Sequence, residues 1–280
     1  MPTSLAIQQD IFAANRATGH IALSVAATGG VTRRKRVHED GSLRVRFPNA
    51  APDALEAVIV NTGGGMTGGD SFAIEIDMGE GASLIAGSAA AEKIYRSNGP
   101  DAKMTMRFDL AAGARLSWLP QETILFDQAR LSRHIEIDVA EGASLLMAEA
   151  VVLGRAASGE VMNHGFFADR WRLRRAGRLV FADGVRLDGA IAARLSEPAV
   201  TDGGIAMAMV LIAPGGDAQL AQGLEQVRAL DENFNGEVGV SAWNGIAVAR
   251  LCAKDGADLR HDLIAVLAAL GAQVPRLWLQ

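Results

Sequence analysis

Apolar and polar residues alternate along most of the chain between His20 and about Leu187. Successive side chains of a strand point to opposite faces, so this alternation is typical of strands with one buried and one solvated face. We predict strands at residues 21–26, 43–47, 56–60, 72–78, 104–110, 133–139, 144–153, 167–174 and 179–186. Turn signals interrupt them at Gly29-Gly30, Asp40-Gly41, Asn98-Gly99-Pro100 and Asp183-Gly184.

A nine-residue pattern occurs three times, at residues 76–84, 108–116 and 137–145. Each copy reads apolar-Asp-apolar, two further residues, Gly-Ala-x-Leu. The glycines are Gly81, Gly113 and Gly142, spaced by 113 − 81 = 32 and 142 − 113 = 29 residues. Self-similarity at such a period indicates stacked units that each bury an apolar face against the next. The glycine provides a turn in which φ can be positive.

Near the C-terminus the spacing of apolar residues changes from that of a strand to that of a helix in two segments. Residues 217–230 and 258–270 each place leucines on one helical face, and residues 237–252 predict a hairpin that turns at Asn244-Gly245. The apolar run 205–213 is far shorter than the roughly 20 residues that span a membrane, so it predicts a buried strand. The expected fold is therefore mainly β: a helical, solenoid-like stack of strands with two C-terminal α-helices. We interpret residues 1–280 as a single domain, with a weakly assigned segment 1–18, a β body 19–215 and a C-terminal α/β elaboration 216–280.

Net charge, cysteine content and the composition of the N-terminal segment limit the classes of function that we expect. The net charge of −5 argues against a general nucleic-acid binder. The single cysteine, Cys252, excludes an internal disulfide and is typical of a reducing compartment. Residues 4–15 mix polar with apolar side chains and predict no secretion signal. We therefore expect a cytoplasmic protein without membrane association.

The glycine-rich block 61–70 follows a predicted strand and contains Gly63, Gly65 and Gly68 at the spacing of a dinucleotide fingerprint. That fingerprint requires a following helix, whereas residues 72–77 alternate as a strand. Asp70 also stands where a phosphate-binding loop of the Walker type requires lysine. A tight connection between strands is the favoured interpretation, with nucleotide binding as the alternative. Replacing Gly68 or Gly69 by Val should then disrupt folding or complex assembly, because a β-branched residue disfavours positive φ.

Two acidic residues of block 118–127, Glu122 and Asp127, suggest a glycosidase-like carboxylate pair. Within a regular strand their odd spacing directs them to opposite faces, which favours structural hydrogen bonding. The five histidines are scattered, and His38-Glu39 lacks the second histidine of H-E-x-x-H because Ser42 stands there. No stable metal site, catalytic constellation or resident cofactor is predicted.

Three further segments allow two interpretations each. The basic run Arg33-Arg34-Lys35-Arg36 is either an edge strand guarded by charge or a site for an acidic partner, the former being favoured. The only tyrosine, Tyr95, lies in the segment Lys93-Ile94-Tyr95-Arg96-Ser97, which is either a polar turn or a recognition patch. Trp278 either covers the core or is presented to a partner.

Five blocks resemble, in the same order, motifs of the UreD (UreH) family of urease accessory proteins. They are residues 61–70, 93–97 (Lys-Ile-Tyr-Arg-Ser), 118–127 (Trp-Leu-Pro-Gln-Glu-Thr-Ile-Leu-Phe-Asp), 153–160 and 274–278. The similarity extends from about Gly19 to the C-terminus, and block 118–127 is its most specific part. Gly63, Glu92 and Val274 depart from the family pattern. The matching residues to which the resemblance gives structural or interaction roles are Asn61, Thr62, Gly64, Gly65, Gly68, Gly69, Asp70, Lys93, Tyr95, Arg96, Pro120, Gln121, Phe126, Gly154 and Arg155.

The resemblance implies a mainly β, solenoid-like maturation factor without catalytic activity. Such a protein binds urease apoprotein and UreF, which recruits the GTPase UreG, and the assembly delivers nickel to urease. A passage through the body is thought to carry the metal, and the candidate carboxylates for this transient nickel path are Glu122, Asp127, Glu149 and Glu160. The alternative function is a β-solenoid enzyme that acts on polysaccharides through Glu122 and Asp127; the third is a nucleotide-binding module that uses residues 61–70.

Overall fold

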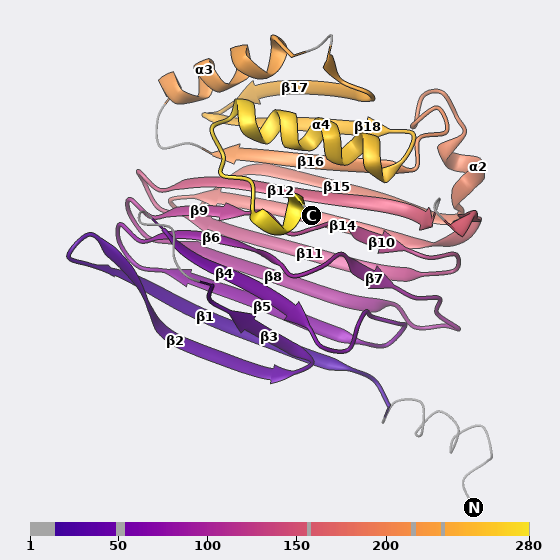
Figure 1. The fold of residues 1–280 in the computed structure, drawn as a ribbon, viewed down its shortest axis with the longest axis horizontal. Coiled ribbons are helices and arrows are strands. Elements are labelled where there is room, and N and C mark those ends of the chain that lie inside the picture. The colour runs from indigo at the N-terminus through magenta and orange to yellow at the C-terminus, as the bar shows by residue number, and fades with distance from the viewer. Residues whose placement is uncertain (1–14, 49–53, 156–157, 214–216, 231–232, 280) are drawn as a thin grey trace, which may run out of the picture.

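In a computed structural model, two β-sheets lie face to face and their strands run lengthwise across the molecule (Figure 1). The structure describes residues 15–48, 54–155, 158–213, 217–230 and 233–279. Most of the segment 4–15, for which we predicted no secretion signal, lies outside the described residues. Mainly β architecture with helices near the C-terminus confirms the predicted fold class.

The first sheet has seven strands among the described residues. In spatial order they are β15 (Arg178–Ala190), β14 (His164–Arg175), β11 (Arg130–Val139), β8 (Ala102–Leu110), β5 (Ser71–Met78), β1 (Thr18–Thr28) and β2 (Val31–Gly41). The central strands β1, β5, β8, β11 and β14 pair in parallel, and an antiparallel hairpin partner closes each side.

The second sheet has its own central parallel run. Its spatial order is β17 (Glu237–Trp243), β18 (Ile246–Ala253), β16 (Ala206–Ala213), β12 (Ser144–Arg155), β9 (Arg115–Trp118), β6 (Ser83–Ser88), β4 (Leu55–Asn61) and β3 (Leu43–Arg46). Three short strands extend it off this path: β7 (Glu92–Ile94), β10 (Thr123–Leu125) and β13 (Glu160–Val161).

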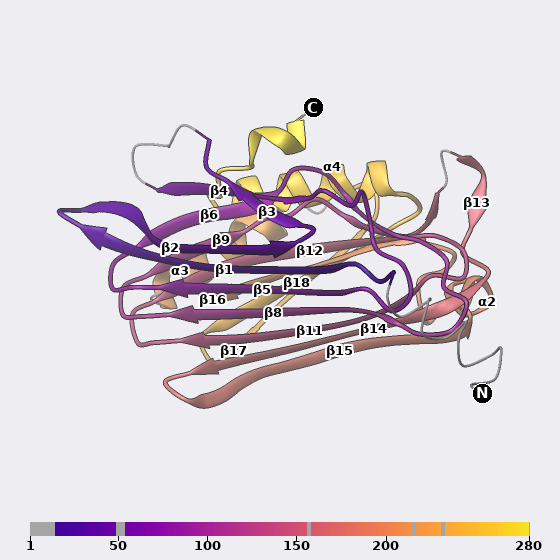
Figure 2. The same cartoon turned by 90° about the horizontal axis from the view of Figure 1, so that it is seen from below.

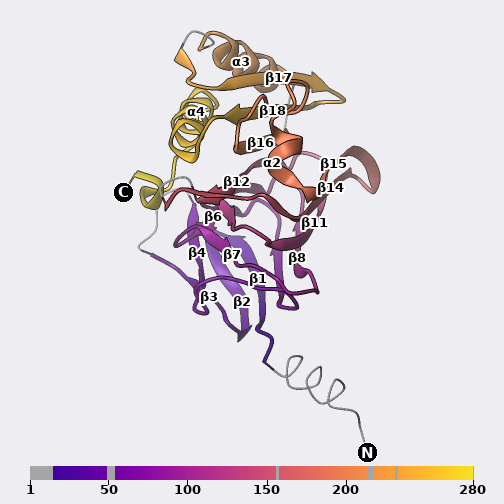
Figure 3. The same ribbon diagram turned by 90° about the vertical axis from the view of Figure 1, so that its right-hand side faces the viewer.

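The chain alternates between the two sheets, so that each circuit adds one parallel strand to both. Figure 3 shows the two layers end-on. The nine-residue pattern forms the link from first sheet to second: Gly81, Gly113 and Gly142 have φ of 63°, 66° and 74°. The backbone N–H of Gly81 donates to the carbonyl of Ala112 at 3.0 Å, which joins successive turns. The repeat therefore specifies the stacking, as its period predicted.

The main core lies between the two sheets. It contains the inward residues of the alternating strands, including Ile21, Ile76, Phe108, Ile137 and Trp171. A β-bulge at Lys35 interrupts the β1–β2 pairing, and Arg33, Arg34, Lys35 and Arg36 are exposed on the edge strand β2. The edge-strand interpretation of this basic run is confirmed, since bulges and charges both discourage pairing with other chains.

A second core covers the outer face of β12, β16 and β18. Helices α3 (Asp217–Arg228) and α4 (Gly256–Ala269) pack there through Leu224, Leu263 and Leu267. Asp255 caps α4 by accepting from the N–H groups of Ala257 and Asp258. Both predicted helices are confirmed. A short helix α2 (Ile191–Leu195) and a 3₁₀ helix η3 (Arg276–Leu279) were not predicted.

Two predicted turns had different outcomes. The β17–β18 hairpin turns at Asn244 and Gly245, whose φ values of 50° and 70° are those of a type I′ turn. The turn predicted at Asp183-Gly184 is wrong, because β15 continues through both residues and pairs them with Trp171 and Arg170. No helix in the described part of the chain is long and apolar enough to cross a membrane.

Candidate functional site

Four of the motif blocks lie at one end of the stack, opposite the glycine turns of the repeat. They form the links from the second sheet back to the first: between β4 and β5, around β7, around β10, and around β13. We call this the motif end. Figure 2 shows β13 and α2 at this end of the molecule. Sequence-distant blocks therefore become neighbours because each circuit of the stack places its return link beside the previous one.

The glycine block fits against the block 93–97. Met66 N–H donates to the Lys93 carbonyl, and Tyr95 N–H donates to the Met66 carbonyl, both at 2.7 Å. A Cβ at Gly65 would lie 2.4 Å from the Tyr95 ring, and one at Gly68 would lie 1.8 Å from Ser97 Oγ. These glycines permit close backbone approach, as the favoured interpretation required. Gly69 has φ of 91°, whereas Gly68 is limited by space alone, so the positive-φ reason given for Gly68 was wrong.

Polar side chains of the same block stabilise these links. Asp70 is buried and accepts from the N–H groups of Thr67 and Ala17, both at 2.8 Å. Asn61 Nδ2 donates to Glu92 Oε1 at 2.9 Å and to the Gly65 carbonyl at 3.1 Å. The Thr62 hydroxyl donates to the Ser42 carbonyl at 2.9 Å. Gly64 has φ of 74°, and its carbonyl accepts from the Tyr95 hydroxyl at 3.1 Å. A strand follows this block, so the helix that a dinucleotide fingerprint requires is absent at this position.

An aromatic and cationic surface covers the outside of the motif end. The Tyr95 and Phe126 rings meet edge to face with centroids 5.0 Å apart, and the Arg155 guanidinium lies 4.2 Å from the Phe126 ring centroid. Arg155 also pairs with Glu160. Lys93 and Arg96 are exposed beside them. Gly154 has φ of 98° and permits the approach of Glu160, whose carbonyl would lie 2.7 Å from an added Cβ.

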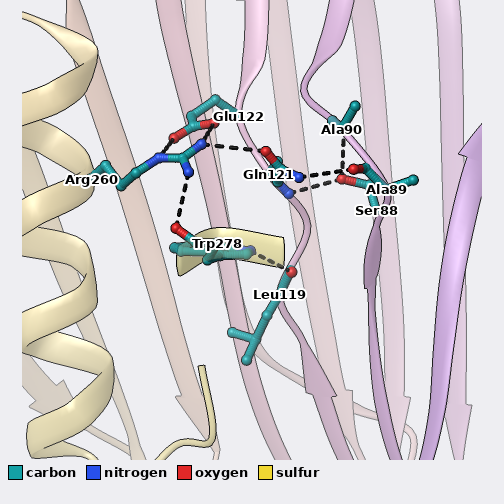
Figure 4. A network of polar contacts seen from close by, with 8 residues as sticks. All are labelled: Ser88, Ala89, Ala90, Leu119, Gln121, Glu122, Arg260 and Trp278. Atoms are coloured by element: carbon teal, nitrogen blue, oxygen red, sulfur yellow. Dashed lines mark hydrogen bonds and ion pairs between the residues drawn. The ribbon is translucent and has the colours of Figure 1, made fainter. Parts of the chain in front are cut away.

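Block 118–127 is joined to the C-terminal segment (Figure 4). Arg260 of α4 donates to both carboxylate oxygens of Glu122, at 2.8 and 2.6 Å, and to the Trp278 carbonyl at 3.1 Å. The buried Trp278 indole donates in turn to the Leu119 carbonyl at 3.1 Å. Gln121 bonds to the Ser88 hydroxyl and the Ala89 carbonyl. Trp278 therefore covers the second core, which decides between its two interpretations.

A buried charge cluster of Arg133, Glu149 and Asp169 lies between the two sheets. Arg133 donates to both oxygens of Asp169, at 3.0 and 2.6 Å, and pairs with Glu149. Two indoles complete it: Trp118 donates to Glu149 at 2.7 Å, and Trp171 donates to Asp169 at 3.0 Å. Two carboxylates share one guanidinium, so the fully ionised cluster carries a net negative charge inside the protein. Burial raises the pKa of Glu149 in spite of Arg133.

Two cavities share Glu149 in their linings. The larger, of about 400 Å³, lies between β11, β14 and β15 of the first sheet and β12, β16, β17 and β18 of the second. Its lining includes the charge cluster together with Asp183, Glu237 and Cys252. The smaller, of about 50 Å³, lies beneath the motif end, and its lining includes Glu92, Pro120, Gln121, Thr123 and again Glu149. Burial raises the pKa of Glu92 to about 7, although the Asn61 hydrogen bond opposes that shift.

The four predicted path carboxylates occupy different environments. Glu149 lines both cavities. Glu122 is held by Arg260, and Glu160 by Arg155. Asp127 accepts from the His164 N–H at 3.1 Å; burial opposes its charged form, but backbone hydrogen bonds outweigh that effect and lower its pKa. Neither Glu122 nor Asp127 lines the two cavities, and each is engaged by a partner of its own.

Sequence reasoning missed Arg133, Asp169 and Glu92. A signal for the first two was present in the sequence. Arg133 points to the same face of its strand as Ile135 and Ile137, and Asp169 points to the same face as Phe167 and Trp171. Glu149 likewise points to the same face of β12 as Met147 and Val151. A charged residue at an apolar-face position on each of three strands predicts a buried polar cluster.

Fold and site together define a solenoid-like β scaffold with polar return links and cavities between its sheets that carry charged side chains. The sequence model of the family described as "UreD urease accessory protein" matches residues 17–279. The chain belongs to the UreD family of urease accessory proteins. A UreD of Rhodopseudomonas palustris (strain BisA53) is 58% identical over 269 residues, covering 96% of this chain and 93% of that relative. A UreD of Bradyrhizobium diazoefficiens is 53% identical over 279 residues, covering 100% of both chains.

Proposed function

We propose that this protein is a non-catalytic scaffold of urease maturation in the cytoplasm. It binds urease apoprotein and UreF, and through UreF the GTPase UreG, and it helps to deliver nickel as cargo without a resident cofactor. Family membership supports the maturation role. The engagement of Glu122 and Asp127 by separate partners disfavours the polysaccharide-active alternative, which needs two carboxyl groups facing one substrate.

The observation that carries the delivery role is the position of Glu149 in the lining of both cavities between the sheets. A transit route needs ligands that hold an ion weakly enough to release it. Carboxylates that already share a guanidinium meet this requirement, because a passing cation competes with Arg133 for them. We propose that nickel passes from the larger cavity, by Asp169 and Glu149, to the smaller cavity and Glu92. Glu122, Asp127 and Glu160 then support the surrounding structure.

The motif end is the proposed docking surface for one protein partner. Tyr95, Phe126 and Arg155 form a packed aromatic and cationic surface there, and aromatic and arginine side chains are enriched at protein interfaces. Lys93 and Arg96 extend it with positive charge.

A deletion strain tests the maturation role. Urease subunits should be produced normally but contain little nickel and show little activity, and the intact gene supplied in trans should restore both. Full urease activity in the deletion strain, grown with ordinary nickel, would contradict the proposal. Affinity capture of the tagged chain from cells that coexpress the urease subunits and UreF tests the partners separately.

A further inference from the structure

Three side chains outside the route described above lie together on the outer face of the first sheet. They are His20 of β1, His38 of β2 and Glu75 of β5. Ala22 pairs with His38 on one side and with Glu75 on the other. Its short methyl group therefore lies between two longer side chains. His20 is two residues earlier on the same strand, so it projects from the same face.

His20 lies close to both of the other side chains. The His20 and His38 ring centroids are 5.2 Å apart, and His20 Nε2 lies 3.4 Å from Glu75 Oε1. Within the described residues, His20 Nε2 is the one buried side-chain nitrogen or oxygen that makes no hydrogen bond. A buried polar atom without a hydrogen bond is suited to contact an ion or a ligand.

We infer that His20, His38 and Glu75 form a surface site for a divalent transition-metal cation. Two imidazole nitrogens and a carboxylate oxygen suit nickel, zinc or copper better than magnesium. Asp40, paired with His20 across β1 and β2, adds negative charge nearby. Arg107, paired with Glu75 across β5 and β8, is engaged by Asp109. That nickel is the physiological cation rests on the proposed function; the site would then hold cargo on the outer face before it reaches the interior.

Binding requires small adjustments of exposed groups. In the described residues no three or more His, Cys, Asp or Glu side chains already surround a common metal position. His38 and Glu75 are exposed, so rotation about their side-chain torsions meets little resistance. His20 is the fixed member, since its Nε2 is already buried against Glu75.

Calorimetric titration of the untagged full-length chain with Ni²⁺ tests the inference. The single variants His20→Asn and His38→Asn should each weaken one class of site at least about tenfold. His134→Asn is the matched control, because His134 is exposed on the same sheet face at β11, and it should leave the titration unchanged. Zn²⁺ should compete for the site, whereas Mg²⁺ should not.

Identical nickel titrations for the wild type, His20→Asn and His38→Asn would overturn the site. The readout is binding by the isolated chain, so it is independent of urease activation. Loss of nickel binding in these variants supports the site even if a deletion strain matures urease normally, and a nickel-poor urease in that strain supports the proposed function even if the titrations are identical.

Discussion

Arg260 and Glu122 are 138 residues apart in the sequence, yet the guanidinium binds both oxygens of the carboxylate. This bidentate pair joins helix α4 to the most specific motif block of the family. Glu122 is buried, so loss of the arginine leaves a carboxylate without its counter-charge.

Replacing Arg260 by Met should lower the free energy of unfolding by about 2 kcal/mol, because the buried carboxylate loses its partner and Trp278 loses a carbonyl contact. Urea denaturation measures this difference. Arg194→Met is the control, since Arg194 pairs with Glu197 on the exposed surface and its loss should cost far less. Equal losses of unfolding free energy in the two variants would show that the Arg260–Glu122 pair stabilises the protein no more than a surface ion pair does.

Replacing Gly68 by Ala should destabilise the protein by about 2 kcal/mol or more, because the new Cβ would overlap Ser97 Oγ and the Pro100 carbonyl. Gly99→Ala is matched to it: Gly99 lies in the same loop region, has no positive φ, and has nothing within 4 Å of an added Cβ. Thermal unfolding of both variants gives the comparison. A Gly68→Ala protein as stable as Gly99→Ala would contradict the close packing of the motif end.

Glu92 should make stability depend on pH. Its pKa is raised from 4.5 to about 7 in the folded chain, so between these values the folded state binds more protons than the unfolded state. The stabilising contribution of Glu92 to the free energy of unfolding is therefore fully present below pH 4.5 and is lost as pH rises to about 7. Glu92→Gln should remove this pH dependence. Above about pH 7 the variant should have a free energy of unfolding higher than that of wild type, by on the order of 2 kcal/mol after allowance for solvent screening.

Urea midpoints of wild type and Glu92→Gln, measured across the acidic and neutral range, test this expectation. The two curves should diverge as pH rises. Parallel curves would show that Glu92 titrates in the folded protein as it does in the unfolded chain.

Charge reversal at Lys93 and Arg96 should abolish capture of one partner, urease apoprotein or UreF, because both cations are exposed on the proposed docking surface. The control is Arg170→Glu, at an exposed position on the outer face of the first sheet. Pull-down of each partner separately identifies which one is lost. Unchanged capture of both by Lys93→Glu/Arg96→Glu would exclude the motif end as an interface.

Local sequence patterns were sufficient for most of the long strands, the repeat and the two helices, but not for the short strands β7, β10 and β13. The Gly-Ala turns predicted stacking because only a residue tolerant of positive φ suits Gly81, Gly113 and Gly142. The charge cluster was missed because it depends on pairings between distant strands: Arg133 meets Asp169 only when β11 and β14 lie side by side. His20 and His38, which we had described as scattered, meet through the β1–β2 hairpin.

The turn wrongly predicted at Asp183-Gly184 shows how tertiary context overrides a local signal. Asp183 accepts from Arg250 at 2.7 Å, and the pairing with β14 keeps β15 extended through Gly184. The hairpin turn instead falls at Ala176 and Gly177, with φ of 47° and 78°.

The interior route is tested most directly by nickel content per urease active site when Glu149→Gln replaces the wild-type protein in maturation. Glutamine keeps the size of the side chain and an acceptor for the Trp118 indole, so the variant should fold and still capture urease apoprotein. We predict urease with strongly reduced nickel, while Asp109→Asn, which removes an exposed carboxylate of the outer face, gives normal loading. Normal nickel content with Glu149→Gln would contradict passage of the metal through the cavities that Glu149 lines.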